Sequence, residues 1–272
     1  MTRKFSSPPH LRLDVRPTLR EIRWFGHIDR HGPQSSKFLY ELTRNTHRCR
    51  DSALRRLQAL REAGYLLLPR QQRQIAKAEF NPYVYDLSRL GWEVLADHQN
   101  LERHCRPTGH WWHCYWVSAV SSAVEIKAAR ADLSYIPAAQ ILAITTSSMG
   151  LPLNKFTLIP DQLFAIKYPA GYRAFALEVD RGSEPVRSRA ARKSLQKSVM
   201  QYQQVLNDRL YRRHWGLKSN LAVLWVFTNA RRRTQFSSLL EPGERRFRYC
   251  ASESSFLSWY VSASLVDELD LV

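Results

Sequence analysis

Three carboxylates in the second half of the chain have a spacing that brings them to one site. Asp161 precedes one expected strand, and Glu178 and Asp180 end the next strand along the chain. The Tyr-Pro-Ala-Gly segment between the strands suits a hairpin loop that pairs Lys167 with Tyr172. Counting outward from that pair places Asp161 opposite Glu178, and strand alternation places Asp180 on the same face. The sequence therefore predicts three carboxylates converging at one end of a β-hairpin.

Carboxylates held this close repel one another unless a cation neutralises them. Oxygen-only ligands suit Mg²⁺ or Mn²⁺, and these ions activate water and neutralise charge in phosphodiester hydrolysis. We therefore predict a Mg²⁺ or Mn²⁺ site at Asp161, Glu178 and Asp180. The alternative is that the three carboxylates are simply solvated near a sheet edge.

The elements that must hold these residues alternate between helix and strand. The segment 221–228 is almost wholly apolar, so we expect a strand that is buried on both faces. The full expected series is helix 112–131, strands 156–160, 162–167 and 172–180, helix 187–207, strand 221–228, helix 230–240 and strand 246–251. This order predicts an α/β domain over residues 112–272.

The first half of the chain has a different pattern, over residues 18–103. Helices are expected at 18–30, 37–43, 52–63 and 88–103, and strands at 65–68 and 83–87. Two consecutive helices with a two-stranded ribbon behind them are typical of a winged helix-turn-helix domain. Residues 104–111 contain Pro and Gly and are the expected linker to the second domain.

The helix expected at 52–63 would be the recognition helix of this domain. Leu54, Leu57 and Leu60 recur every three residues and predict its buried face, Asp51 is its expected cap, and Thr18 with Glu21 predicts a capping box on the first helix. Basic residues gather at the two places where a winged helix meets DNA, and Arg donors suit both phosphates and guanine edges. These residues are Arg48, Arg50, Arg55 and Arg56 at the recognition helix, and Arg70, Arg73 and Lys77 in the wing. The alternative is a winged helix that serves protein contact or dimerisation.

The second domain resembles the PD-(D/E)XK nuclease superfamily in its order of helix, Pro-Asp, strand hairpin, Glu-x-Asp, basic helix and apolar strand. More narrowly, it is similar to the replication-relaxation family of plasmids, phages and integrative elements, most strongly in the segment LIPDQLFAIKYPAGYRAFALEVDRGSEPVRSRAARKSLQKSVMQY. The resemblance implies a restriction-endonuclease-like fold behind a winged helix. It implies Asp161 and Glu178 as metal ligands, with Glu125 as a further ligand.

One position departs from the superfamily pattern. A nuclease of this type usually has Lys two residues after its acidic strand residue, where this chain has Asp180. Lys193 or Lys197 on the following helix can substitute, or the domain has kept the fold and lost the chemistry.

Further basic and metal-binding residue types surround these motifs. Arg187, Arg189 and Arg192 either hold the DNA backbone beside the carboxylates or form a solvated helix face. A cluster of His and Cys runs from His104 to Cys114, but its spacing matches no zinc finger known to us, so we expect no zinc.

The bulk composition agrees with a nucleic-acid partner. The 272 residues carry a formal net charge of +17, and both halves of the chain are basic. We expect neither a signal peptide nor a transmembrane segment, and four scattered cysteines suit a reducing compartment, so we expect a cytoplasmic protein without a membrane partner.

The sequence thus predicts a protein of a mobile genetic element that binds double-stranded DNA in replication, mobilisation or its regulation. Its nuclease-like domain is either degenerate or, alternatively, an active Mg²⁺-dependent endonuclease. Other proteins of the element's replication or transfer machinery are candidate partners, and the sequence allows a homodimer without requiring one.

Overall fold

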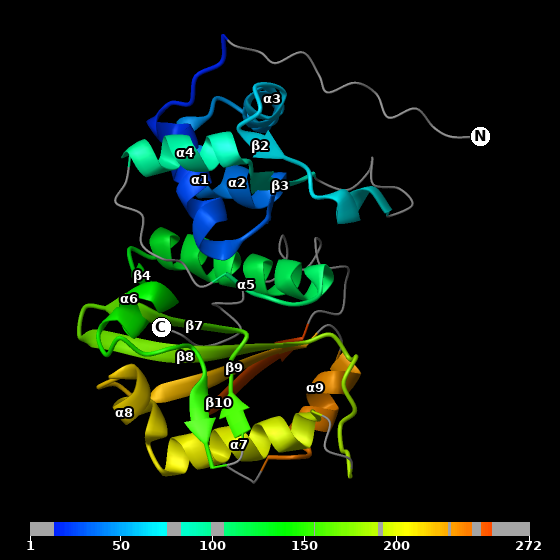
Figure 1. The fold of residues 1–272 in the computed structure, drawn as a ribbon, viewed down its shortest axis with the longest axis vertical. Coiled ribbons are helices and arrows are strands. Elements are labelled where there is room, and N and C mark those ends of the chain that lie inside the picture. The colour runs from blue at the N-terminus through cyan, green and yellow to red at the C-terminus, as the bar shows by residue number, and fades with distance from the viewer. Residues whose placement is uncertain are drawn as a thin grey trace. The chain divides into compact units, whose positions relative to one another are not determined.

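The computed structural model describes residues 14–74, 83–98, 106–154, 156–189, 193–227, 230–240 and 246–251. The chain divides into two compact units, Met1–Trp111 (unit 1) and Trp112–Val272 (unit 2) (Figure 1). Helices and strands are mixed in both, which confirms the predicted combination of α and β structure. Among the described residues, no helix is both long and apolar enough to cross a membrane.

Unit 1 combines helices with a small antiparallel sheet. Its helices are α1 (Leu19–His31), α2 (Ser36–Leu42), α3 (Arg50–Glu62) and α4 (Arg89–His98), and its strands are β1 (Gln34–Ser35), β2 (Leu66–Leu67) and β3 (Val84–Leu87). The strand order is β1-β3-β2, and β3 is antiparallel to both neighbours. Every one of these elements except β1 overlaps an element that the sequence predicts. The residues after α4, up to residue 105, lie outside the described part of the chain.

An apolar stripe on α3 contributes to the core of unit 1. Leu57 and Leu60 are fully buried, as predicted, and they join a cluster that contains Trp24 of α1. Ala53 completes the buried stripe, whereas Leu54 is only half-buried. The buried positions therefore follow the four-and-three spacing of a helix face and not a strict repeat of three.

The Ser52 side chain hydrogen-bonds to the backbone at the start of α3. Its hydroxyl donates to the carbonyl of Cys49 (2.7 Å) and accepts from the backbone N–H of Cys49 (3.4 Å). The helix begins at Arg50. The predicted cap, Asp51, is therefore wrong, because Asp51 already lies within the helix.

Unit 2 is built around a five-stranded mixed sheet. Its helices are α5 (Trp111–Arg130, which starts at the end of unit 1), α6 (Ala138–Ala143), α7 (Leu195–Asn207), α8 (Leu210–Trp215) and α9 (Ala230–Ser237). Its strands are β4 (Ser134–Pro137), β5 (Leu151–Leu153), β6 (Phe156–Leu158), β7 (Gln162–Tyr168), β8 (Gly171–Asp180), β9 (Leu221–Phe227) and β10 (Phe247–Ala251). The order is β10-β9-β8-β7-β4, with β8, β9 and β10 parallel and the β4–β7 and β7–β8 pairs antiparallel.

The two faces of this sheet are covered by different helices. Figure 1 shows α5 along one face and α7 along the other. Almost every residue of β9 is buried, as predicted from its apolar sequence. The short β5–β6 pair forms a separate antiparallel ribbon. The central strands β8 and β9 therefore sit between two layers of helix, and a polar side chain on them must find its partner within the protein.

The β7–β8 hairpin has the predicted register. Lys167 pairs with Tyr172, and the ladder continues one pair further to Tyr168 and Gly171, so the loop narrows to two residues. At the other end, the backbone N–H of Asp161 donates to the carbonyl of Leu177 (3.0 Å).

The basic segment before α7 is not helical where the sequence predicts a helix from residue 187. The helix begins at Leu195, because the Ser194 side chain caps it by accepting from the backbone N–H of Lys197 (3.4 Å). The backbone N–H groups of the first helical residues donate to the carbonyls of Pro185 and Val186 (3.1 and 2.9 Å). These contacts tie the preceding loop to the start of α7.

Candidate functional site

The hairpin and the parallel strand beside it position the candidate carboxylates. The β7–β8 ladder ends at the Gln162–Leu177 pair, so the next position along it would bring Asp161 level with Glu178, which β8 pairs with Trp225 of β9. Asp161 immediately precedes β7, and Glu178 lies near the end of β8. This register agrees with the predicted approach of the two groups, and the charge of Asp161 acts on Glu178.

Glu178 is a buried carboxyl group with two polar neighbours. It is 5% exposed, the Tyr202 hydroxyl donates to its Oε1 (2.6 Å), and the Lys193 Nζ lies 3.7 Å from its Oε2. Burial, together with the nearby charge of Asp161, raises the pKa of Glu178 from 4.5 to about 8, although Lys193 and Tyr202 act in the opposite direction. A cation placed at this group would favour its ionised form and so oppose the rise in pKa.

Asp161 is held by contacts to both of its oxygens. The backbone N–H of Val179 donates to Oδ2 (2.7 Å), and Nε2 of His113 on α5 lies 2.9 Å from Oδ1. No sequence pattern predicts this contact, because 48 residues separate His113 from Asp161. Its only signal was its position in the His and Cys cluster considered for zinc.

Asp180 is paired with an arginine. Arg232 of α9 donates to both of its oxygens, from Nε to Oδ1 (3.2 Å) and from Nη2 to Oδ2 (2.5 Å). The two side chains are 8% and 10% exposed, so this is a buried ion pair. Asp180 therefore has a counter-charge of its own, and its role as a third metal ligand stays a prediction. Strand alternation brings Asp180 to the expected face, but α9 delivers a counter-charge there.

Lys193 is one of the two lysines predicted to substitute for the lysine that Asp180 replaces, and it lies close to Glu178. It lies two residues before α7, and its Nζ lies 3.7 Å from Glu178 and 3.5 Å from Glu184. Burial acts to lower the pKa of Lys193, but the charges of Glu178, Asp161 and Glu184 outweigh it and raise the pKa above its usual value. The ammonium group therefore stays charged at neutral pH.

A cavity of about 820 Å³ opens beside Glu178. Lys193 and Lys197 line it together with Glu178, so the two predicted lysines and one predicted carboxylate share a single pocket. The remaining lining residues come from α7 and from the β6 segment: Phe156, Thr157, Leu158, Ile159, Met200, Gln201 and Gln204.

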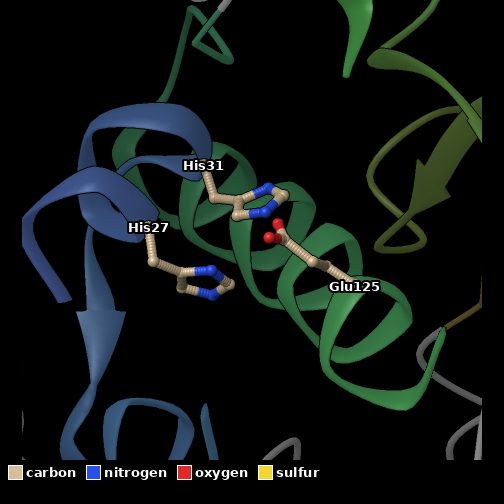
Figure 2. A group of neighbouring side chains, drawn as sticks. All are labelled: His27, His31 and Glu125. Atoms are coloured by element: carbon tan, nitrogen blue, oxygen red, sulfur yellow. The ribbon is translucent and has the colours of Figure 1, made fainter. Parts of the chain in front are cut away.

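Glu125 lies away from this site. It projects from the second half of α5 (Figure 2), twelve residues beyond His113 on the same helix. At about 1.5 Å of rise per residue, that spacing is about 18 Å. The prediction of Glu125 as a ligand beside Asp161 is therefore wrong. Figure 2 also shows His27 and His31, which are buried one turn apart on α1 of unit 1, with ring centroids 4.6 Å apart.

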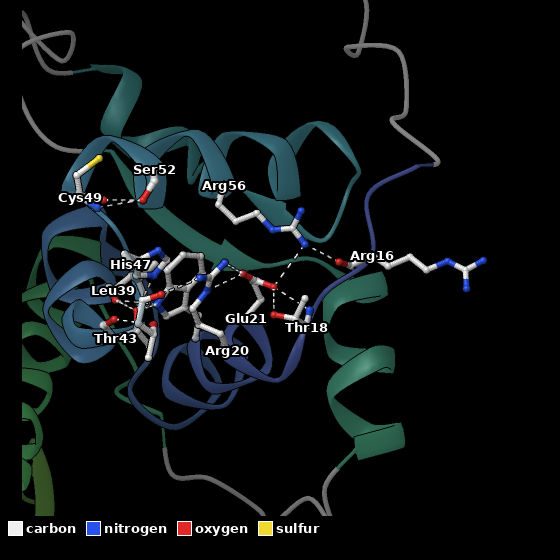
Figure 3. Close-up of polar contacts among 12 residues, drawn as sticks. Arg16, Thr18, Arg20, Glu21, Leu39, Thr43, His47, Cys49, Ser52 and Arg56 are labelled. Carbon is white, nitrogen blue, oxygen red and sulfur yellow. Dashed lines mark hydrogen bonds and ion pairs between the residues drawn. The ribbon is translucent and has the colours of Figure 1, made fainter.

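In unit 1, Arg56 takes part in a buried polar network (Figure 3). The carboxylate of Glu21 is fully buried and accepts from Thr18, which confirms the predicted capping box, and from Arg20. Nη2 of Arg56 lies 3.4 Å from Glu21 and also donates to the carbonyl of Arg16. Burial acts to raise the pKa of Glu21, but the Thr18 and Arg20 hydrogen bonds and the Arg56 charge lower it below its usual value. Arg56, which the sequence places among the arginines expected to contact DNA, is therefore turned towards Glu21 of α1 instead.

The other basic residues predicted around α3 are on the surface. Arg48, Arg50 and Arg55 are exposed at or near its first turns, and Arg70 is exposed after β2. The side chain of Arg73 and the whole of Lys77 lie outside the described part of the chain. The structure therefore leaves three arginines at the start of α3 available to a polyanion.

The remaining predicted residues lie in the loop before α7 or near α5. Arg187 and Arg189 are exposed, but in a loop rather than on a helix, and Arg192 lies outside the described residues. Of the residues weighed for zinc, His104 and Cys105 also lie outside them, while burial raises the pKa of the half-buried Cys114. His113 contacts Asp161 instead.

The family follows from a match over most of the chain. The family model described as Replication-relaxation matches residues 25–221. This chain belongs to the replication-relaxation family. Membership implies a role in the replication of mobile elements, and the matched span contains Asp161, Glu178 and Lys193. Searches of curated proteins and of solved structures gave no significant match.

Proposed function

We propose that unit 1 of this replication-relaxation protein is a winged helix that binds duplex DNA. The order α1-β1-α2-α3-β2-β3 supports this fold, because it places a helix pair before a two-stranded ribbon. α3 then serves as the recognition helix. Arg48, Arg50 and Arg55 are exposed at its N-terminal end, where a recognition helix meets base edges and phosphates.

We further propose that unit 2 is a PD-(D/E)XK-like domain that cleaves DNA with a divalent metal ion. The observation that carries this proposal is the 3.7 Å separation between Lys193 Nζ and Glu178 Oε2. The superfamily pattern needs two carboxylates and an amine, and Asp180 occupies the usual position of the amine. Lys193 supplies that amine from the start of α7, so the departure at Asp180 does not by itself remove the chemistry.

The donor set fits Mg²⁺ or Mn²⁺. Asp161 and Glu178 offer only oxygen atoms, which these hard cations prefer. Glu178 is buried and its pKa is raised, so a bound cation would have to displace its proton, and the charge of the cation would favour the ionised form. A bound Mg²⁺ or Mn²⁺ would neutralise this charge and activate a water molecule for attack on a phosphodiester.

The chain's own residues would position and charge the site. Tyr202 orients Glu178 through its hydroxyl, and the Val179 N–H orients Asp161. Lys193 stays protonated and places a positive charge where a phosphate or an attacking water would lie next to Glu178. In this proposal the two carboxylates hold the metal ion and the lysine supplies the positive charge.

The test is cleavage of supercoiled plasmid by the full chain in Mg²⁺ or Mn²⁺. We expect nicked or linear product from the parent and at least a hundredfold lower rate from Lys193→Met, within the range that charge stabilisation contributes. The matched control is Lys218→Met, an exposed lysine outside the pocket lining, which should cleave like the parent. Equal cleavage by Lys193→Met and the parent would contradict the assigned role.

One observation favours a second candidate, a DNA-binding protein whose nuclease-like domain has lost cleavage. Both oxygens of Asp161 already have partners, His113 and the Val179 N–H. Salt-sensitive DNA binding by the parent, without cleavage in either metal, would support this candidate. Calorimetric titration with Mn²⁺ then shows whether the metal site survives. Binding that Glu178→Gln abolishes would mean that the site is retained.

A further inference from the structure

The pocket beside Glu178 has one apolar wall. Phe156 is 64% exposed, Ile159 62% and Met200 60%, and all three line the same cavity. They come from β6, from the residues after it, and from α7, which lie next to each other in unit 2 (Figure 1). Large apolar side chains left in contact with water lose the free energy that burial would provide. Their grouping in one pocket therefore points to a ligand with an apolar face.

The α7 side of the pocket is polar except for Met200. Lys197, Gln201 and Gln204 lie at positions i, i+4 and i+7 of α7 and so share one face of that helix. Glutamine amides both donate and accept hydrogen bonds, which suits the mixed edge of a nucleobase. Lys193 and Lys197 supply positive charge for a phosphate. The pocket volume of about 820 Å³ is within the roughly 300–1,000 Å³ of small-molecule sites.

We propose that this pocket binds one unstacked nucleotide of a single-stranded DNA segment, with its base against Phe156 and its phosphate at the lysines. The inference rests on the proposed function in one respect, that unit 2 acts on DNA. It goes beyond it by specifying the substrate: a duplex keeps each base stacked on its neighbours, so only an unpaired base can present its face to Phe156. Because Glu178 lines the same pocket, the backbone of that strand would run past the carboxylates. The preferred substrate is then single-stranded DNA or a junction between single and double strands.

The test is fluorescence anisotropy of the full chain, in EDTA, with labelled dT20 and with a labelled 20-base-pair duplex. Phe156→Ala should weaken binding to dT20 by about fivefold to a hundredfold, as expected for the loss of one stacked base, and leave duplex binding unchanged. Phe156→Trp should bind dT20 at least as tightly as the parent, because Trp offers a larger stacking face. The matched control is Ile144→Ala, which removes an apolar side chain that is 68% exposed and outside the pocket lining.

The outcomes separate this inference from the proposed function. Loss of dT20 binding in Phe156→Ala supports the nucleotide site even if the parent neither cleaves plasmid nor binds duplex. Parent-like dT20 binding by Phe156→Ala, or no dT20 binding by the parent, overturns the inference even if cleavage is observed. If Phe156→Ala instead changes the sedimentation of the protein and not its dT20 affinity, the pocket contacts another protein chain and the inference is also overturned.

Discussion

Replacing Glu178 with glutamine should stabilise unit 2 at pH 8 but much less at pH 5, in metal-free buffer. In the folded protein, burial and the charge of Asp161 raise the pKa of Glu178 to about 8 from 4.5. The folded state therefore holds a proton that the unfolded chain releases above pH 4.5. The stability from this group is fully present below pH 4.5 and is lost progressively as the pH rises towards 8. Glutamine is neutral throughout and removes this loss.

The expected size follows from the pKa shift. Each pH unit between the unfolded and folded pKa values is worth about 1.4 kcal/mol. Between pH 5 and pH 8 the parent should therefore lose about 3–4 kcal/mol relative to Glu178→Gln. For a unit of this size, that difference corresponds to a change on the order of 10 °C in melting temperature.

The assay is differential scanning calorimetry of parent and variant at pH 5, 6.5 and 8 in EDTA. The control is Glu184→Gln, which removes the other carboxylate beside Lys193 but from a more exposed side chain. Asp161→Asn, which removes a charge that raises the pKa of Glu178, should reduce the pH dependence of the parent. A Glu178→Gln difference that is the same at all three pH values would refute the reasoning, because it would mean that Glu178 does not titrate in this range.

Three further predictions concern packing and charge in the two units. Leu57→Ala should lower the free energy of unfolding of unit 1 by about 2–5 kcal/mol in urea titrations, whereas Leu54→Ala should cost less because Leu54 is only half-buried. Arg55→Ala should weaken duplex binding in a shift assay with unchanged stability, while Arg56→Ala should instead cost about 1–2 kcal/mol of stability by removing a partner of a buried carboxylate. Reversed outcomes would show that the two side chains have been assigned to the wrong faces of α3. Arg232→Met should cost about 3–5 kcal/mol by leaving a buried aspartate unpaired, and a parent-like melting temperature would exclude the ion pair.

Features that depend on short-range periodicity could be predicted from the sequence. The register of the β7–β8 hairpin follows from its loop, the Thr18 capping box from a three-residue spacing, and the burial of Leu57 and Leu60 from helical repeat. In each case the interacting groups are neighbours in the chain or are related by one turn. Local geometry then restricts the arrangement, whatever the rest of the fold does.

The partners of charged side chains were decided by tertiary packing alone. Alternation places Asp180 on one face of β8, but α9, some fifty residues later, determines that Arg232 neutralises it. His113 reaches Asp161 from α5, and Arg56 turns towards Glu21 because α3 packs beside α1. Such pairings depend on distances and desolvation across the folded chain, and no residue spacing encodes them directly. The raised pKa of Glu178 has the same origin, since burial between two helical layers is a property of the assembled sheet.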